Sequence, residues 1–307
     1  MRSLNVDVGG PLFVADYGGS GPLMLLVHGL GGSHLNWMSV GGDLAQDHRV
    51  LAPDLPGFGR TPSAGRRATI AENVRLVEAL VQHLGDGPAT LVGNSMGGLI
   101  SLAVAAGRPD LVERLVLVDP ALPVPPNERL RLDPVALRFA LAYVVPRLGE
   151  YLLSRMGGTA GAEGIVRTTL ERCTVDISRI DPAVVTATIA LEAERMQHPS
   201  WHEAVVEGSR SIVQTLFARG HVQRWIRGVT TPTLLMHGRQ DRVVTVRAAR
   251  AAAELRADWE YVELDGAGHI PMMEVPRQFL DVTRQWMAGD ARTAAGAGET
   301  EAVSAAV

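Results

Sequence analysis

The sequence predicts a doubly wound α/β fold, in which helices cover both faces of a mostly parallel β-sheet. Short apolar runs recur along the 307-residue chain, and amphipathic helical patterns lie between them. Near-continuous apolar strands are typical of parallel sheets that are buried on both faces, and strand–helix alternation is the pattern of doubly wound folds. The alternation stops once, over residues 120–228, which indicates an insertion into the fold.

The elements of the main domain follow from periodicity. Residues 1–18, with a Gly9-Gly10-Pro11 turn in their middle, are expected to form an antiparallel hairpin at the sheet edge. An apolar stripe or an Ala-rich composition predicts helices over 69–84, 96–107 and 245–256. The runs that are expected to form buried strands are 24–28, 49–53, 89–93, 115–118, 232–236 and 259–264.

The insertion has a purely helical pattern. It opens with prolines that exclude a helix, which are Pro120, Pro123, Pro125 and Pro126. Helical periods follow over 134–156, 162–173, 181–197 and 201–219. The first of these is strongly apolar, which fits either packing on the core or a lid over an acyl chain. We therefore predict a core domain of residues 1–119 and 229–288, a helical cap of residues 120–228, and a disordered tail of residues 289–307.

Composition and charge narrow the classes of partner. A formal net charge of −4 and a pI of about 6.1 do not indicate binding to nucleic acid or to an anionic membrane surface. The single cysteine, Cys173, cannot form an internal disulfide and is interpreted as a buried small hydrophobe. The N-terminus does not resemble a signal peptide, and no apolar run reaches about 18 residues. We expect a cytoplasmic protein without a membrane span, and the sequence leaves open whether it is a monomer or a homodimer.

The strongest chemical motif is Gly93-Asn94-Ser95-Met96-Gly97-Gly98, which lies between a predicted strand and a predicted helix. A G-x-S-x-G sequence in this context is the pattern of a nucleophile elbow. The strained turn projects the serine from the carboxyl edge of the sheet, near the positive end of the helix. Ser95 is therefore the predicted nucleophile, and the alternative is an ordinary tight strand–helix turn.

A serine nucleophile needs a base, and the base needs an acid that orients it. His269 follows the last predicted strand in the loop Gly266-Ala267-Gly268-His269, so it opens on the same sheet edge as Ser95. Asp241 follows the preceding predicted strand and is expected to accept the imidazole N–H. Asp119, at the end of the strand after the elbow, is the second choice for this acid.

An oxyanion hole is expected from two backbone N–H groups. Met96 directly follows the nucleophile, and Leu30 lies in the Gly-rich loop after strand 24–28. The alternative for this loop, a phosphate-binding loop, lacks the required Lys and Ser/Thr. The residues that are expected to support these turns are His28, Gly29, Gly31 and Asn94.

Several other residues receive structural interpretations. His28 and His237 are expected to hydrogen-bond nearby backbone, and Trp37 and Met38 are expected to anchor the first helix in the core. No Cys/His cluster or H-E-x-x-H pattern indicates a metal site, and we expect no cofactor.

The order of the motifs along the chain resembles that of the α/β-hydrolase fold superfamily over roughly residues 10–288. The matching stretches are His28-Gly29-Leu30-Gly31-Gly32, Asp54-Leu55-Pro56-Gly57-Phe58-Gly59, the elbow, and the loops of Asp241 and His269. The chain order of serine, aspartate and histidine is also that of α/β-hydrolases. The resemblance implies an eight-stranded, mostly parallel sheet with a helical cap after the sixth strand. It also implies a Ser95–His269–Asp241 triad.

The expected activity is hydrolysis of a carboxylic ester of a hydrophobic small molecule through an acyl-enzyme. Haloalkane dehalogenases and epoxide hydrolases of this superfamily carry an aspartate at the elbow, so Ser95 argues against both. Gly-Asn-Ser-Met-Gly-Gly is common in C–C bond hydrolases of meta-cleavage products, but these usually place Trp after the histidine, where this chain has Ile270. A C–C hydrolase and a non-catalytic ligand-binding protein remain the alternatives, since fold alone does not decide function.

Overall fold

The computed structural model describes residues 1–85, 87–125, 148–198 and 202–289, and for residues 148–159 it describes the backbone course only. The apolar start of the cap at 134–147 and the tail at 290–307 lie outside these residues, so the predictions made for them are not addressed by the structure. In the described part of the chain, no helix is both long and apolar enough to cross a membrane.

One sheet of eight strands runs through the molecule in the order β1-β2-β4-β3-β5-β6-β7-β8. β1 and β2 form an antiparallel hairpin, β2 also pairs antiparallel with β4, and the other neighbours are parallel. The predicted fold class and the edge hairpin are confirmed. The strands are β1 (Arg2–Asp7), β2 (Pro11–Gly18), β3 (Leu23–Val27), β4 (Arg49–Pro53), β5 (Ala89–Asn94), β6 (Val112–Val118), β7 (Thr233–Gly238) and β8 (Glu260–Leu264).

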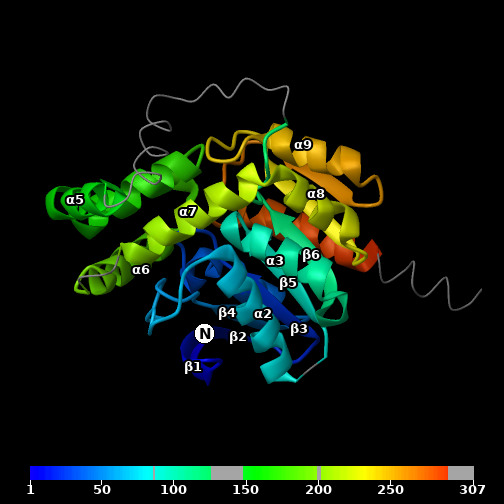
Figure 1. The fold of residues 1–307 in the computed structure, drawn as a ribbon, viewed down its shortest axis with the longest axis horizontal. Coiled ribbons are helices and arrows are strands. Elements are labelled where there is room, and N and C mark those ends of the chain that lie inside the picture. Colours follow the sequence, from blue (N-terminus) through cyan, green and yellow to red (C-terminus); the bar gives the residue numbers. More distant parts are fainter. Residues whose placement is uncertain (86, 126–147, 199–201, 290–307) are drawn as a thin grey trace, which may run out of the picture.

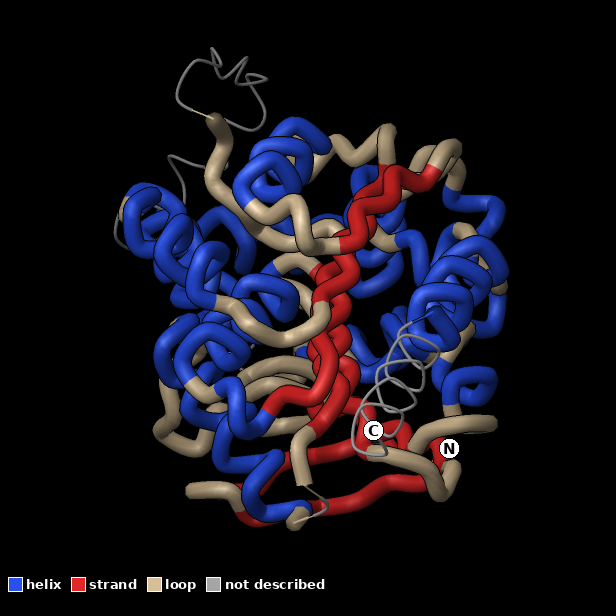
Figure 2. Tube along the Cα trace, turned by 90° about the vertical axis from the view of Figure 1, so that its right-hand side faces the viewer, coloured by secondary structure: helices blue, strands red, loops and turns tan. Residues whose placement is uncertain are grey.

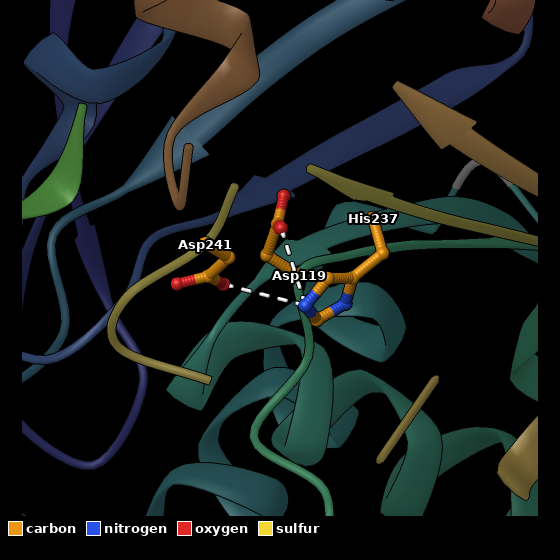
Figure 3. A group of neighbouring side chains, drawn as sticks. All are labelled: Asp119, His237 and Asp241. Carbon is orange, nitrogen blue, oxygen red and sulfur yellow. Dashed lines mark ion pairs between the residues drawn. The ribbon is translucent and has the colours of Figure 1, made fainter. Parts of the chain in front are cut away.

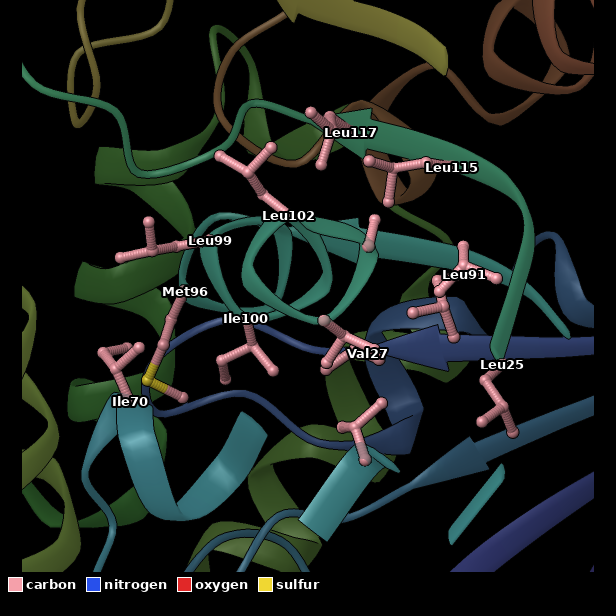
Figure 4. Packing of buried hydrophobic residues seen from close by; sticks show 14 of the residues in the cluster. Leu25, Val27, Ile70, Leu91, Met96, Leu99, Ile100, Leu102, Leu115 and Leu117 are labelled. Atoms are coloured by element: carbon pink, nitrogen blue, oxygen red, sulfur yellow. The ribbon is translucent and has the colours of Figure 1, made fainter. Parts of the chain in front are cut away.

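Helices cover both faces of the twisted sheet (Figure 2). Alternate residues of a strand face opposite sides, so Leu25 and Val27 of β3 belong to one core and Met24 and Leu26 to the other. The first core packs against α2 (Ile70–Leu84), α3 (Met96–Gly107), α8 (Arg219–Gly228) and α9 (Val246–Leu255), and Figure 4 shows its packing around α3. The second core packs against η1 (His34–Trp37), α1 (Gly41–Leu44) and the last helix, residues 276–289. Burial on both faces explains why the strands are continuous apolar runs.

The predicted helix over 69–84 illustrates how local signals fix an element. The Thr69 side chain accepts a hydrogen bond from the backbone N–H of Glu72, which caps the first turn of α2. Gly85 adopts φ 69° directly after the helix, and this left-handed conformation ends it. Between these caps, the buried stripe of α2 includes Leu76, Val77 and Leu80.

The helical insertion follows β6, as predicted, and its first described helices lie at one end of the molecule (Figure 1). The helix α5 (Leu148–Cys173) is interrupted at Gly161, where φ is 64° and ψ is −179°, so two shorter helices meet there. The next helices are α6 (Pro182–Arg195) and α7 (Glu203–Phe217). The short turns η2 (Pro109–Leu111), η3 (Ile177–Arg179) and α10 (Pro271–Glu274) complete the described helical elements.

Two expectations need correction. The predicted helical period over 201–219 continues after a break at Ala218 (φ −76°, ψ 50°) into α8, whose Val222 and Ile226 are buried one turn apart. The sequence analysis did not predict this helix. Trp37 is fully buried as expected, but Met38 is 39% exposed. Only a single 3-10 turn forms at this point, and its neighbouring residues cannot both point into the core.

The parallel strands β3, β5, β6, β7 and β8 all end at the same edge of the sheet. In open α/β sheets, ligands bind outside this carboxyl edge. The loops that follow these strands carry the predicted site residues, and the cap lies over them, as the contacts below show.

Candidate active site

Ser95 lies at the tip of a strained turn between β5 and α3. Its φ of 55° and ψ of −115° are unfavourable for a residue with a side chain. The turn is closed by a hydrogen bond from the Ser95 N–H to the Val118 carbonyl, at 3.0 Å. A Cβ atom on Gly93 would lie 2.4 Å from the Gly97 carbonyl oxygen, and a Cβ on Gly97 would lie 2.1 Å from that of Val27. The elbow therefore requires glycine at both positions.

His269 and Asp241 form a buried pair at the ends of β8 and β7. The imidazole Nδ1 lies 2.7 Å from Asp241 Oδ2, and both side chains are almost fully buried. The other oxygen, Oδ1, accepts hydrogen bonds from the backbone N–H groups of Val243 (2.6 Å) and Val244 (3.0 Å). These bonds fix the carboxylate so that the histidine keeps its proton on Nδ1 and presents Nε2 as a base.

The electrostatics of this pair favour a charged acid beside a basic imidazole. Burial raises the pKa of Asp241, but the His269 and His237 imidazoles outweigh it and hold the pKa below its usual range. Burial lowers the pKa of His269, but the charge and hydrogen bond of Asp241 outweigh it and leave the pKa above the ordinary value for histidine. Asp241 thus stabilises an imidazolium at His269, as proton uptake from a serine would require.

Asn94 connects the histidine loop to the elbow. Its side-chain Nδ2 donates to the carbonyl oxygens of Val118 (3.1 Å) and His269 (3.0 Å). Among the residues that the structure describes, no hydrogen bond joins the Ser95 hydroxyl to the His269 ring. Such catalytic bonds are often long without substrate. The Asn94 side chain holds the two loops together without such a bond.

The cap also holds the histidine loop in place. The His269 N–H donates to the carbonyl of Cys173 at the end of α5, at 2.6 Å. The buried Glu274 carboxylate accepts the N–H groups of Val175 (2.7 Å) and Asp176 (2.9 Å) through Oε1, and that of Gly268 (2.8 Å) through Oε2. One carboxylate therefore ties the cap to the loop of the predicted base. The sequence analysis missed Glu274, although an acid at the end of the apolar run Ile270-Pro271-Met272-Met273 was a usable signal.

The predicted oxyanion side consists of tightly packed backbone and apolar side chains. Met96 is the first residue of α3, so its N–H has no acceptor within the helix. A Cβ on Gly29 would lie 3.1 Å from Ser95 Cβ, so this loop passes directly beside the nucleophile. Gly208 of α7 faces the same place, because its Cβ would lie 2.8 Å from Leu30 Cδ1 and 3.7 Å from Met96 Sδ. The cap reaches the predicted oxyanion residues with an apolar surface.

His28 has the supporting position that the sequence predicts. Its Nδ1 lies 2.7 Å from the Gly29 carbonyl and therefore donates, while its Nε2 accepts the N–H of Leu55 at 3.0 Å. Burial lowers the pKa of His28, which keeps the ring neutral in this arrangement. The next loop is fixed by Asp54, whose carboxylate accepts the N–H groups of His34 (2.6 Å) and Arg60 (2.8 Å).

Asp119 and His237 are buried neighbours of Asp241 (Figure 3). Asp119 accepts the N–H of Gly238 at 2.8 Å, which holds the loop that begins after β7. Both carboxylates approach the same ring nitrogen of His237, since Nε2 lies 3.6 Å from Asp119 Oδ1 and 3.4 Å from Asp241 Oδ2. The predicted backbone contact of His237 is present, since its Nε2 is 3.0 Å from the Val244 carbonyl. The structure thus pairs Asp241, and not the second-choice Asp119, with His269.

A cleft of about 580 Å³ lies between the loop after β4 and the cap helix α6, and none of its lining residues belongs to the Ser95, His269 and Asp241 group. The charged residues around it pair with one another, as Arg195 does with Glu192 (2.8 Å) and Arg60 with Glu194 (3.9 Å). This cleft is therefore separate from the sheet edge that carries Ser95, His269 and Asp241.

The fold and the arrangement of these loops are those of a known family. The chain belongs to the alpha/beta hydrolase family, whose model matches residues 24–282. It is 30% identical over 278 residues to 2-hydroxy-6-oxo-6-(2'-aminophenyl)hexa-2,4-dienoic acid hydrolase of Metapseudomonas resinovorans, covering 88% of this chain and 85% of that protein. It is 43% identical over 112 residues to lipase LipV of Mycobacterium tuberculosis, covering 36% of this chain and 42% of the lipase. A thermophilic esterase from Thermogutta terrifontis has the same fold, with a TM-score of 0.71 at 24% identity over 94% of this chain and 99% of that one.

Proposed function

We propose that this protein is a serine hydrolase that cleaves a carboxylic ester of a hydrophobic small molecule. The observation that carries the proposal is the buried His269–Asp241 pair, at 2.7 Å, held on the same sheet edge as the strained Ser95 elbow. Nucleophile, base and orienting acid come from three different strand ends and are tied together by backbone hydrogen bonds. A protein that only bound a ligand would not need all three groups.

The proposed reaction has two acyl-transfer steps. Ser95 Oγ attacks the ester carbonyl carbon while its proton passes to Nε2 of His269. The N–H groups of Leu30 and Met96 stabilise the oxyanion, and each such donor is typically worth about 3 kcal/mol. The imidazolium then protonates the leaving alcohol, which departs and leaves an acyl-enzyme. His269 next removes a proton from water as the water oxygen attacks the acyl carbon. The imidazolium then returns this proton to Ser95 Oγ as the bond from Oγ to the acyl carbon breaks, and the acid is released.

The surroundings of the proposed oxyanion hole support a neutral, apolar substrate. The contacts there come from Leu30, Met96 and Gly208. Of these residues, Met96 is fully buried. A charged acyl group beside these residues would lose its hydration without gaining a partner. A panel of p-nitrophenyl esters of increasing chain length tests this point, and turnover of the acetate alone would count against an apolar acyl pocket.

The second candidate is hydrolysis of a C–C bond in a vinylogous dienone acid on the same residues. The similarity to the Metapseudomonas resinovorans hydrolase over most of both chains favours it. The position directly after the histidine is a buried Ile270, where the resemblance leads us to expect Trp in C–C hydrolases. Turnover of a dienone acid faster than of any ester in the panel would select this candidate.

Covalent labelling by a fluorophosphonate probe is the direct test of the nucleophile. The wild-type protein should be labelled at Ser95, and Ser95→Ala should not be labelled. Ser101→Ala is the matched control, because Ser101 is a buried serine of α3 whose loss leaves the elbow intact. Full labelling of Ser95→Ala would refute the assignment. A wild-type protein that resists the probe and hydrolyses neither substrate class would indicate a ligand-binding protein.

A further inference from the structure

Asp241 also belongs to a second buried cluster of ionisable side chains, which it forms with Asp119 and His237 (Figure 3). All three side chains are completely buried. His237 Nε2 lies 3.4 Å from Asp241 Oδ2 and 3.6 Å from Asp119 Oδ1. Two carboxylates, one of them the partner of His269, therefore share one imidazole in a site without solvent.

The position of the His237 proton follows from a third neighbour. Nε2 is 3.0 Å from the carbonyl oxygen of Val244, and a carbonyl oxygen only accepts. Nε2 therefore carries a proton and directs it towards three oxygen atoms. A metal ion would need the lone pair of that same nitrogen, and Asp241 already uses Oδ1 for Val243 and Val244 and Oδ2 for His269. The geometry fits a shared proton and not a metal ion.

Asp119 is held rigidly beside this imidazole. Its backbone has φ 44°, in the left-handed region, and its N–H donates to the Met236 carbonyl at 3.0 Å. Its Oδ1 accepts from Gly238, while Oδ2 is buried and has no hydrogen-bond partner among the described residues. Burying this second carboxylate next to Asp241 costs free energy, because two negative charges repel each other, unless a positive charge lies close to both. Burial raises the pKa of Asp119 to about 7, and burial of His237 is outweighed by Asp119 and Asp241, which raise its pKa to about 9.

We propose that His237 and Asp119 are positioning residues of the catalytic site, which act through Asp241 and set the pH range in which His269 is a free base. His237 offsets the charge of the second buried carboxylate and holds Asp241 towards His269. Asp119 fixes the strand end from which the loop of Asp241 departs. The inference rests on the proposed function in one respect, namely that His269 is the base.

His237 and Asp119 influence the pKa of His269 in opposite directions. A protonated His237 disfavours a second positive charge on His269, whereas an ionised Asp119 favours it. The other ionisable groups around the loop are Asp241, the Cys173 thiol at the end of α5, and Glu274, which accepts the N–H of Gly268. Arg179 also faces the loop, since it donates to the Gly266 carbonyl at 2.7 Å and lies 4.0 Å from Glu274. Burial raises the pKa of Cys173 to about 12, so the thiol stays neutral.

The test is the pH dependence of fluorophosphonate labelling of Ser95 in His237→Gln and Asp119→Asn. Both variants keep the local hydrogen bonds, because a glutamine amide can donate to Val244 and an asparagine oxygen can accept from Gly238. In His237→Gln the midpoint of the acid limb should rise by about one pH unit, and in Asp119→Asn it should fall by about half a unit, since Asp119 is only partly ionised there. If the two shifts add, the midpoint of the double variant should lie about half a pH unit above that of the wild type.

Two surface changes serve as matched controls, His83→Gln on α2 and Asp47→Asn in the loop after α1, and neither should move the midpoint. Shifts in the same direction, or lower rates at every pH with an unmoved midpoint, would overturn the inference and indicate a purely structural role. An NMR titration of the His269 ring measures the same pH shifts without an activity assay, so it tests the inference even if one variant is poorly labelled. Failure of the wild type to label at all would instead refute the proposed function.

Discussion

Glu274 offers the sharpest test of how the cap supports the proposed active site. Its buried carboxylate accepts three backbone N–H groups, two from the cap loop after α5 and one from Gly268, beside His269. In Glu274→Gln, the amide oxygen can still accept from Val175 and Asp176. The amide nitrogen then faces the Gly268 N–H, so two donors oppose each other. The substitution keeps the shape of the side chain, removes the bond to Gly268 and removes the negative charge that lies 4.0 Å from Arg179 Nη1.

The expected cost follows from the number of bonds affected. A hydrogen bond to a charged acceptor contributes about 1.5–3 kcal/mol, and a buried N–H left without a partner costs a similar amount. Losing the Gly268 bond and weakening the other two should lower the free energy of unfolding by about 2–4 kcal/mol. A typical domain has about 5–15 kcal/mol in total, so the variant should still fold. Displacing a catalytic group by about 1 Å can cost about a hundredfold in rate, and we expect kcat to fall by about ten- to a hundredfold.

Urea unfolding gives the stability, and ester hydrolysis gives kcat. Hydrogen exchange should accelerate in residues 173–176 and 266–270 of Glu274→Gln and stay unchanged in the central strands. Glu163→Gln is the control, since this exposed carboxylate pairs with Arg167 on the same helix and its loss should change stability by less than about 0.5 kcal/mol. If Glu274→Gln unfolds at the wild-type urea concentration and retains its kcat, the carboxylate does not anchor the histidine loop.

Three further outcomes follow. Gly97→Ala should lower the free energy of unfolding by about 3 kcal/mol or more, because the new Cβ would lie 2.1 Å from the Val27 carbonyl oxygen; Gly107→Ala, which meets nothing within 4 Å, should have no such effect on the urea midpoint. Asp241→Asn should reduce kcat by about 10⁴-fold through the wrong imidazole tautomer, and a variant within tenfold of wild type would point to Asp119 as the acid. Because the pKa of His269 is raised and the base must be neutral, kcat/KM should fall as the pH drops, with a midpoint above the usual histidine value of about 6.5; a lower midpoint would contradict this.

The parts of the fold that follow from local sequence could be predicted. The buried strands are continuous apolar runs because both faces are covered, and the caps of α2 are visible as Thr69 and Gly85. The elbow is equally local, since Gly93 and Gly97 are required by contacts within a few residues of Ser95 and with β3. The carboxyl ends of parallel strands share one edge, so the strand pattern alone was enough to place the loops of Asp241 and His269 near the serine.

Features that depend on distant segments could not be predicted. Nothing near Glu274 in the sequence shows that the cap loop at 175–176 will donate to it, because that contact depends on how the cap docks. Asp119 and Asp241 both follow parallel strands, and only the three-dimensional arrangement distinguishes the partner of His269 from the residue that holds Gly238. The helix α8 escaped prediction because its apolar stripe consists of little more than Val222 and Ile226.

The hydrogen bond between the His269 N–H and the Cys173 carbonyl limits which segments of the cap can be exchanged with those of another hydrolase. A cap taken from another hydrolase to change specificity would replace the acceptor of that bond and both cap donors to Glu274. A chimera joined at the ends of the insertion would therefore disturb the proposed base together with the substrate pocket. One that keeps residues 173–176 from this chain, and exchanges only the helices around them, should retain the geometry of His269.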